Sequence, residues 1–373
     1  MSFLEDNASF EGWLRTQCDV YEPDLKYKHK RMKRDAFTFL RATYFRWAKG
    51  IEGVCTELKH TPAILTAGDL HLENFGTWRD AEGRLVWGVN DLDEAAVIPC
   101  AYDLVRLAVS AQLAREAKDA EEGGLAPFVK LSDVDAADAI LAGYREGLNS
   151  PRPTLLDDQE TWLRPYVACS DGERAKFWKS KIDPLPDEQP AADVMAGFVA
   201  ALPKEASLTR TMRRPKQGGG SLGRPRFVAV ANWRGGRIVR EAKAIVPSAW
   251  DWAHGNAEAA VRVEDLSNGP HRSPDPWLRI NGRYIFRRLA ADARKVDLAQ
   301  NADNDTPSSK EANALRLLQA MGFDVGAMHA TEVSQAAAIT QDLDTRNPSW
   351  LHIAAVTAVH WVKEDYESWC EQI

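Results

Sequence analysis

The chain has 373 residues, enough for about two domains or one large unit with two parts. Its net charge is −7, with 45% hydrophobic and 27% charged residues, which excludes a disordered chain, a collagen and a coiled coil. No apolar run is long enough to span a membrane and the acidic N-terminus lacks a secretory signal, so we expect no membrane association. Five scattered cysteines without a CxxC pair indicate no disulfide framework or zinc site and favour a cytoplasmic location.

The predicted elements change character along the chain. Helices are predicted at 37–50, at 102–113, after Ser132 and at 191–202, with strands and turns over 64–98 and a proline-rich connection over 149–190. Residues 226–246 and 277–289 each read as a hairpin, the second around Asn281-Gly282, so 205–290 is predicted to be a small antiparallel β domain. Helices return at 310–330 and 348–371.

Basic residues concentrate in one part of this acidic chain. Residues 204–243 hold eleven basic side chains and only Glu205 and Glu241 as acidic ones, a local charge of +9. Such a stretch suggests an anionic partner, although a solvated basic face is the more ordinary explanation. Nucleic acid is not expected as that partner, because the chain as a whole is acidic and carries no nucleic-acid motif.

The most specific motif is the segment 68–76, Gly-Asp-Leu-His-Leu-Glu-Asn-Phe-Gly. Asp69 and Asn74 lie on a predicted loop, and a predicted strand pair then returns the chain so that Asp91 faces Asn74. Oxygen ligands of this kind suit Mg²⁺, which takes one or two carboxylates plus substrate phosphates. The remaining carboxylate can accept a proton from a hydroxyl. Turn chemistry would explain a single Gly-Asp dipeptide, but the joint pattern is far more specific.

A second motif is the glycine-rich segment 218–223, whose Gly218, Gly220 and Gly223 fit GxGxxG. Predicted strands follow it, whereas the dinucleotide-binding fingerprint of that form opens a helix. Backbone N–H groups of such a loop, together with Ser221 and the later Lys243, can cradle phosphates. A flexible linker between domains is the alternative interpretation.

The first motif resembles the catalytic and metal loops of aminoglycoside-phosphotransferase-like kinases. The resemblance implies that Asp69 is the catalytic base and that Asn74 and Asp91 bind Mg²⁺. It also implies that His71 and Asp103 orient the loop. A phosphate-binding lysine in that family has an acidic partner, for which Glu258 is the candidate here, with Glu241 and Glu264 as competitors.

The order of the motifs resembles that of a circularly permuted kinase. In those kinases the glycine-rich loop and its lysine precede the catalytic loop, whereas here they follow it. Residues 314–331, including His329, resemble the helix that precedes the catalytic loop. The resemblance implies an α+β, two-lobed, protein-kinase-like fold in permuted order. It places the helical lobe with the catalytic loop at 1–204, the small β lobe at 205–300 and the returning helices at 301–373.

The chain also resembles the bacterial domain of unknown function 2252 family. The matching stretches are GDLHLENFG at 68–76, NDLDE at 90–94, YDLVRLAVS at 102–110, GGGSLG at 218–223 and REAKA at 240–244. Ala42 and Leu92 replace the glycine and phenylalanine usual in that family. Neither replacement removes a proposed ligand or the proposed base.

These features lead us to expect a phosphotransferase that uses ATP and Mg²⁺ and acts on an unidentified hydroxyl acceptor, a small molecule or a protein. A catalytically inactive nucleotide-binding regulatory protein and a nucleotidyltransferase on the same fold are the alternatives. A metallophosphoesterase is disfavoured because the chain contains no Gly-Asn-His motif. The sequence does not define the acceptor or the oligomeric state.

Overall fold

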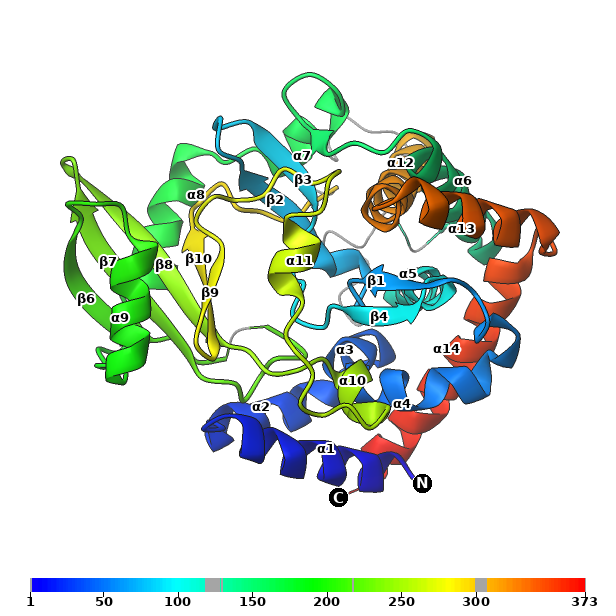
Figure 1. The fold of residues 1–373 in the computed structure, drawn as a ribbon, viewed down its shortest axis with the longest axis horizontal. Coiled ribbons are helices and arrows are strands. Elements are labelled where there is room, and N and C mark those ends of the chain that lie inside the picture. Colours follow the sequence, from blue (N-terminus) through cyan, green and yellow to red (C-terminus); the bar gives the residue numbers. More distant parts are fainter. Residues whose placement is uncertain (1, 118–127, 129, 217, 299–306, 373) are drawn as a thin grey trace.

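The protein has an α+β fold, seen here in a computed structural model that describes residues 2–117, 128, 130–216, 218–298 and 307–372 (Figure 1). The helices are α1 (Phe3–Gln17), α2 (Glu22–Met32), α3 (Ala36–Ala42), α4 (Tyr44–Val54), α5 (Ala101–Ala114), α6 (Asp133–Asn149), α7 (Arg164–Val167), α8 (Asp171–Lys176), α9 (Ala192–Ala201), α10 (Ala249–Ala253), α11 (Val263–Ser267), α12 (Pro307–His329), α13 (Val333–Thr345) and α14 (Trp350–Cys370). Short helical turns are η1 (Thr56–Leu58), η2 (Leu72–Asn74), η4 (Thr161–Leu163) and the π-helical η5 (Phe177–Ile182). Across these described ranges, no helix combines the length and the apolar character that crossing a membrane requires.

The strands form small antiparallel sheets rather than one continuous sheet. They are β1 (Ala63–Thr66), β2 (Phe75–Arg79), β3 (Leu85–Val89), β4 (Ala96–Pro99), β5 (Thr154–Leu155), β6 (Ser207–Arg213), β7 (Arg226–Trp233), β8 (Gly236–Ala244), β9 (Arg279–Asn281) and β10 (Tyr284–Leu289). The largest sheet has the order β6-β7-β8-β10-β9, and α9 packs across it, on the left in Figure 1. The antiparallel sheet predicted within 205–290 is therefore confirmed, as is the predicted hairpin of β2 and β3.

The helix predictions are confirmed where apolar residues recur with the period of a helix. One is wrong, at a place where a side chain bonds to the backbone. The helices predicted at 102–113, after Ser132 and at 191–202 are α5, α6 and α9. The single helix predicted over 37–50 is wrong, because α3 ends and α4 begins around Thr43, whose backbone leaves the helical region. The Thr43 hydroxyl donates to the Phe39 carbonyl at 2.8 Å, a local bond that bends helices.

Helix α13 was not predicted from the sequence. It lies between the two C-terminal helices that were, and only Ile339 and Leu343 among its residues are buried. Two buried side chains give too weak a periodic signal to distinguish a helix from a polar connection.

Helices α6 and α12 approach each other through glycines. Gly143 and Gly147 of α6 face Gly322 and Gly326 of α12. A Cβ on Gly143 would lie 1.8 Å from a backbone oxygen of α12, and one on Gly322 would lie 2.1 Å from a backbone oxygen of α6. Only glycine permits this close contact, which accompanies the packing of α12 against β3 and against β1, the strand that leads into the first motif.

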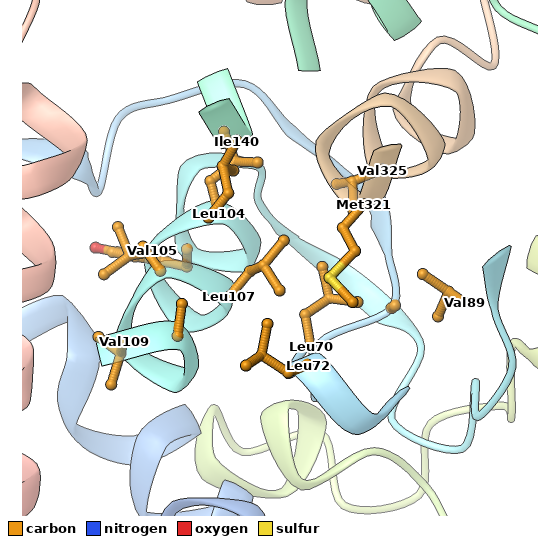
Figure 2. Packing of buried hydrophobic residues seen from close by; sticks show 14 of the residues in the cluster. Leu70, Leu72, Val89, Leu104, Val105, Leu107, Val109, Ile140, Met321 and Val325 are labelled. Atoms are coloured by element: carbon orange, nitrogen blue, oxygen red, sulfur yellow. The ribbon is translucent and has the colours of Figure 1, made fainter. Parts of the chain in front are cut away.

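The buried core holds the first motif in place. Figure 2 shows Leu70 and Leu72 inside the apolar cluster, beside Leu107 of α5 and Met321 of α12. Both leucines are almost fully buried and flank the polar residues of the segment 68–76. Since releasing either side chain would expose apolar surface, the packing fixes the backbone on which Asp69 sits.

Replacing one of the interhelical glycines should therefore destabilise the fold. We expect Gly322→Ala to lower the free energy of unfolding by roughly 3 kcal/mol, because the new methyl group collides with backbone rather than with a movable side chain. Chemical denaturation of the purified variant measures this. Gly12→Ala is the matched control, since a Cβ there meets nothing within 4 Å and should stabilise α1 by about 0.5–1 kcal/mol. Equal stabilities of the two variants would contradict the proposed close contact.

Candidate functional site

A cavity of about 310 Å³ brings the two sequence motifs together. Among the predicted site residues, its lining contains Asp69, His71, Asn74, Asp91, Gly218, Gly220, Ser221 and Lys243. Three others lie outside the lining, namely Asp103, Gly223 and Glu258. The structure therefore gathers residues from the 68–76 segment, the 90–94 segment and the five-stranded sheet around one space.

Asp69 is held by an arginine that the sequence analysis did not identify. The fully buried Arg106 on α5 donates from Nε to Asp69 Oδ1 at 2.9 Å, and from Nη2 to the Leu40 carbonyl at 2.9 Å. Burial raises the pKa of the Asp69 carboxyl, and the charge of Arg106 opposes that rise. The other oxygen, Oδ2, faces Gly220, where an added Cβ would lie only 3.5 Å away. Arg106 thus fixes one oxygen of Asp69 and leaves the other directed at the glycine-rich segment.

Asp103 supports the loop from behind the cavity. Its two carboxylate oxygens accept from the backbone N–H groups of Ala67 and Gly68 at 3.2 and 3.1 Å. His329 of α12 lies 3.4 Å from the same carboxylate. Gly68 has φ +77°, and a Cβ there would lie 2.6 Å from a backbone oxygen, so this turn requires glycine. Asp103 therefore bonds the backbone that leads into the segment 68–76.

His71 is a neutral side chain on the cavity wall. Its Nδ1 accepts from the backbone N–H of Glu73 at 3.2 Å, which places the ring proton on Nε2. Burial lowers the pKa of His71 well below its usual range, and the nearby Arg41 adds to that effect. The imidazole therefore offers a hydrogen-bond donor rather than a positive charge at neutral pH.

Asn74 connects the two acidic segments. Its Nδ2 donates to the backbone carbonyls of Asp69 and Asp91 at 2.9 and 3.0 Å, and its Oδ1 accepts from the Asp91 N–H at 2.9 Å. As the sequence predicted, Asp91 faces Asn74. The amide oxygen expected to bind a metal is engaged by backbone, so the visible role of Asn74 is to hold the two segments together.

Lys243 pairs with aspartates, not with the predicted glutamate. Its Nζ lies 3.2 Å from both carboxylate oxygens of Asp91 and also contacts Asp93. The lysine is 2% exposed, whereas Glu258 is exposed and lies outside the cavity lining. The prediction for Glu258 is corrected, because β8 directs Lys243 toward the segment after β3. Desolvation at the cavity would raise the pKa of Asp91, but the charges of Lys243 and Arg287 hold it below its usual range.

The competitors of Glu258 also have other partners. The carboxylate of Glu264 accepts from the Ile280 N–H at 2.7 Å. Glu241 is completely buried and pairs with Arg214, Arg226 and Arg287. Although burial would raise it, these three charges hold the pKa of Glu241 well below its usual range. Glu241, which lies on the same strand as Lys243, therefore holds together three arginines from neighbouring parts of the sheet.

That arginine cluster contacts the glycine-rich segment. Arg226 Nη2 donates to Ser221 Oγ at 3.1 Å. Gly220 lies against the backbone of Arg41, whose carbonyl oxygen would be 3.2 Å from an added Cβ. Gly223 packs against α2 on the far side of the segment, and its carbonyl accepts from the Tyr21 N–H at 2.8 Å. The segment is thus anchored at both ends around the cavity.

A clamp behind β3 positions the residues that precede Asp91. Asp324 of α12 accepts from the Val89 N–H at 2.8 Å, and Arg272 donates to the Val89 carbonyl at 2.6 Å. The two side chains lie 3.2 Å apart and satisfy each other's charge. Gly88 is required here, because a Cβ would lie 2.5 Å from the Asp324 carboxylate. Nothing local in the sequence links these residues, so only the tertiary structure revealed the clamp.

Preformed metal coordination is limited. Within the residues that the structure describes, no group of three or more His, Cys, Asp and Glu side chains is placed to hold a metal ion. Asp91 and Asp93 form a pair of carboxylates at Lys243. One or two carboxylates are what Mg²⁺ takes from a protein when substrate phosphates supply further ligands.

Comparison with known proteins supports one resemblance. Residues 22–150 match the family described as "Uncharacterized protein conserved in bacteria (DUF2252)". The matched stretch contains Asp69, Asn74, Asp91 and Asp103 and ends before the glycine-rich segment. No curated protein and no solved structure shows a significant match to the chain.

Lys28 is a buried amine on the cavity wall whose titration can be measured. Its Nζ donates to the Gly220 carbonyl at 3.3 Å, and burial lowers its pKa to about 8. Because the folded state then binds fewer protons than the unfolded state above pH 8, the contribution of Lys28 to stability should rise with pH. Between pH 7 and pH 9.5, the free energy of unfolding of wild type should rise by about 2 kcal/mol relative to that of Lys28→Met. Urea denaturation at each pH measures this.

Tyrosines and cysteines titrate in both proteins, so their contributions to the pH dependence of stability cancel in the comparison with Lys28→Met. Arg283→Met is the control, because Arg283 is exposed. The difference in free energy of unfolding between wild type and this variant should not depend on pH. A flat pH profile for the Lys28 difference would show that this amine is not desolvated in the folded state.

Proposed function

We propose that the protein is a phosphotransferase that uses ATP and Mg²⁺ and has a circularly permuted, protein-kinase-like fold. The observation that carries the proposal is the convergence of Asp69, Asp91 and Lys243 with the glycine-rich segment around one cavity. Lys243 and Asp91 are 152 positions apart in the chain, so their pairing is a property of the tertiary structure. Phosphoryl transfer requires mainly positioning of the reactants and neutralisation of charge, and the residues around this cavity are suited to both.

The packing of α1 against α14 supports a permuted order. The ring of Phe3 in α1 lies 5.6 Å from that of Trp369 in α14, and Lys33 donates to the Gln372 carbonyl at 3.0 Å. Figure 1 places the two ends of the chain side by side. Adjacent termini make a permuted connection physically tolerable. In the proposed fold, α12 leads toward the catalytic loop through the contact of His329 with Asp103.

The glycine-rich segment and Lys243 would bind the phosphates of ATP. Backbone N–H groups of such a segment bind anions, and Gly218 has φ +85°, which favours glycine. In the complex, the ammonium of Lys243 would donate to a phosphate oxygen in addition to its aspartates. The cluster around Glu241 adds positive charge beside this point, since three arginines surround one carboxylate.

Asp91 and Asp93 are the residues that would hold Mg²⁺. Their oxygens are the hard ligands this ion prefers, and the side chain of Asp91 is half-exposed at the cavity. When bound, the ion neutralises charge on the phosphates. Asn74 would keep the Asp91 backbone in register with Asp69 through its three hydrogen bonds.

Asp69 would orient the acceptor hydroxyl through Oδ2. Arg106 holds Oδ1 from the buried side, so the carboxylate cannot rotate without losing a charged hydrogen bond. The raised pKa of Asp69 makes it a better proton acceptor than an ordinary aspartate, while His71 offers an N–H donor on the same wall.

Substitutions of the two aspartates should separate binding from turnover. We expect ATP and Mg²⁺ together to raise the melting temperature of wild type by a few degrees, as about 2.7 kcal/mol of binding energy at 100 times Kd predicts. Asp91→Asn should lose this shift. Asp69→Asn should keep the shift but transfer the γ-phosphate at least about 100-fold more slowly. Thermal unfolding and transfer of label from γ-labelled ATP to a panel of hydroxyl acceptors measure the two effects.

Asp138→Asn is the matched control, because Asp138 is exposed on α6 and outside the cavity. It should leave both the shift and the transfer unchanged. Transfer of label from the α-phosphate instead would identify a nucleotidyltransferase. A magnesium-dependent shift without transfer to any acceptor would favour a nucleotide-binding regulatory protein, and the absence of any shift at millimolar ATP would contradict the proposal.

A further inference from the structure

A second cavity, of about 440 Å³, adjoins the first. Asn90, Arg214, Arg287 and Lys295 line both cavities. Asn90 immediately precedes Asp91, so the two spaces meet beside the proposed phosphate site. A molecule in the second cavity would therefore have one end next to the phosphates of a nucleotide in the first. Its volume lies in the range of sites for small organic ligands.

The lining of the second cavity is rich in arginine and lysine, although several of these side chains pair with carboxylates, such as Arg272 with Asp324 and Lys295 with Glu73. The lining contains seven arginine and lysine side chains and only Asp275 and Asp292 as acidic ones. Glu241, which pairs with the shared Arg214 and Arg287, belongs to neither lining. The carboxylate therefore sits behind the arginines, which present their positive charge to the cavity. Such an arrangement favours an anionic ligand.

The arginine at the junction, Arg287, has N–H donors that Glu241 does not use. Arg287 uses Nε and Nη2 for Glu241, with the Nε bond at 2.7 Å. A guanidinium carries five N–H donors, so Glu241 does not occupy those on Nη1. Planar pairs of arginine N–H groups suit carboxylate and phosphate oxygens. Lys295 reaches the same junction and bonds to Glu73 at 2.6 Å.

Much of the remaining wall is apolar, with Thr77, Asn90 and Ser267 as its uncharged polar residues. Trp78, Leu92, Leu278 and Leu289 contribute carbon surface to the second cavity. The indole of Trp78 is itself fixed, because its N–H donates to the Ser273 carbonyl at 2.7 Å. A ligand that fits would bury an apolar body against these side chains while its anionic group meets the arginines. Mixed walls of this kind, with a few placed polar groups, are typical of small-molecule sites.

We propose that the second cavity is the acceptor subsite, and that the acceptor is a small organic molecule carrying a phosphate or carboxylate group on an apolar body. This inference rests on the proposed phosphotransferase function. The acceptor hydroxyl, reaching into the first cavity, forms a bond to the γ-phosphorus of ATP as the bond from that phosphorus to the β–γ bridging oxygen breaks. ADP leaves with the electron pair, and the hydroxyl proton passes to Asp69.

The test uses phenyl phosphate as the probe and benzyl alcohol as its neutral counterpart, with the full chain and isothermal titration calorimetry. Leu278→Trp fills the second cavity without changing charge, and Ala290→Phe is a second blocking variant that also lies outside the lining of the first cavity. We expect each to weaken phenyl phosphate binding at least about tenfold, with Lys295→Gln having a similar effect. Benzyl alcohol should bind wild type at least about tenfold more weakly than phenyl phosphate.

Arg283→Gln is the matched control, because it removes one exposed charge from the turn between β9 and β10 outside both cavities. It should leave phenyl phosphate binding unchanged within twofold. The blocking variants should also keep the thermal shift with ATP and Mg²⁺, and phenyl phosphate should bind wild type in the presence of both.

Three results would overturn the inference while the proposed function stands. These are unchanged phenyl phosphate binding in a folded blocking variant, equal binding of benzyl alcohol, and loss of the nucleotide shift on blocking the second cavity, which would make that cavity part of the nucleotide site. The opposite failure is distinguishable. Charge-dependent phenyl phosphate binding that is lost on blocking, in a protein with no nucleotide shift, supports the anion site and overturns the phosphotransferase.

Discussion

The site depends on a buried lysine held between two aspartates. Lys243 at the end of β8 contacts Asp91 and Asp93, which follow β3, and so joins the five-stranded sheet to the segment beside the 68–76 motif. Burying an ammonium group costs free energy unless the group is paired. Separating the sheet from this segment would therefore leave a buried charge without its partner. Arg224 makes a parallel connection to Glu94 at 2.8 Å. The contact that docks the sheet is therefore the same contact that builds the cavity.

The helical side supplies a rigid frame for this contact. Asp103 and Arg106 lie three residues apart on α5, hence on one face of the helix. Asp103 bonds the backbone at the start of the segment 68–76 and Arg106 bonds the Asp69 carboxylate. From the other side, α12 reaches β3 through Asp324, and its glycine contact with α6 sets that distance. Several elements thus fix the acidic residues. The glycine-rich segment, in contrast, faces Asp69 with the backbone of Gly220.

The basic residues within 204–243 lie in two different environments. Arg210 and Arg237 form exposed or partly exposed pairs with Asp187 and Asp183, as expected of a solvated basic stretch. Arg214, Arg226 and Lys243 instead line the first cavity. Position along the strand separates the two groups, because Arg237 and Lys243 are six residues apart on β8 and therefore point to the same face from opposite ends of that strand. One local charge excess therefore contributes both to the surface and to the candidate site.

The sequence by itself determined the local elements and the two motifs. It predicted α5, α9 and the hairpins, and it predicted that Asp91 would face Asn74, because these features depend on residues a few positions apart. Only the tertiary structure decided which charges pair. The partner of Lys243 was not Glu258. Arg106 and Glu241 lie in the stretches YDLVRLAVS and REAKA, but nothing in those stretches indicated which charges they pair with. The physical reason is that a buried charge is satisfied by whatever long-range packing brings to it, and spacing along the chain does not encode that choice.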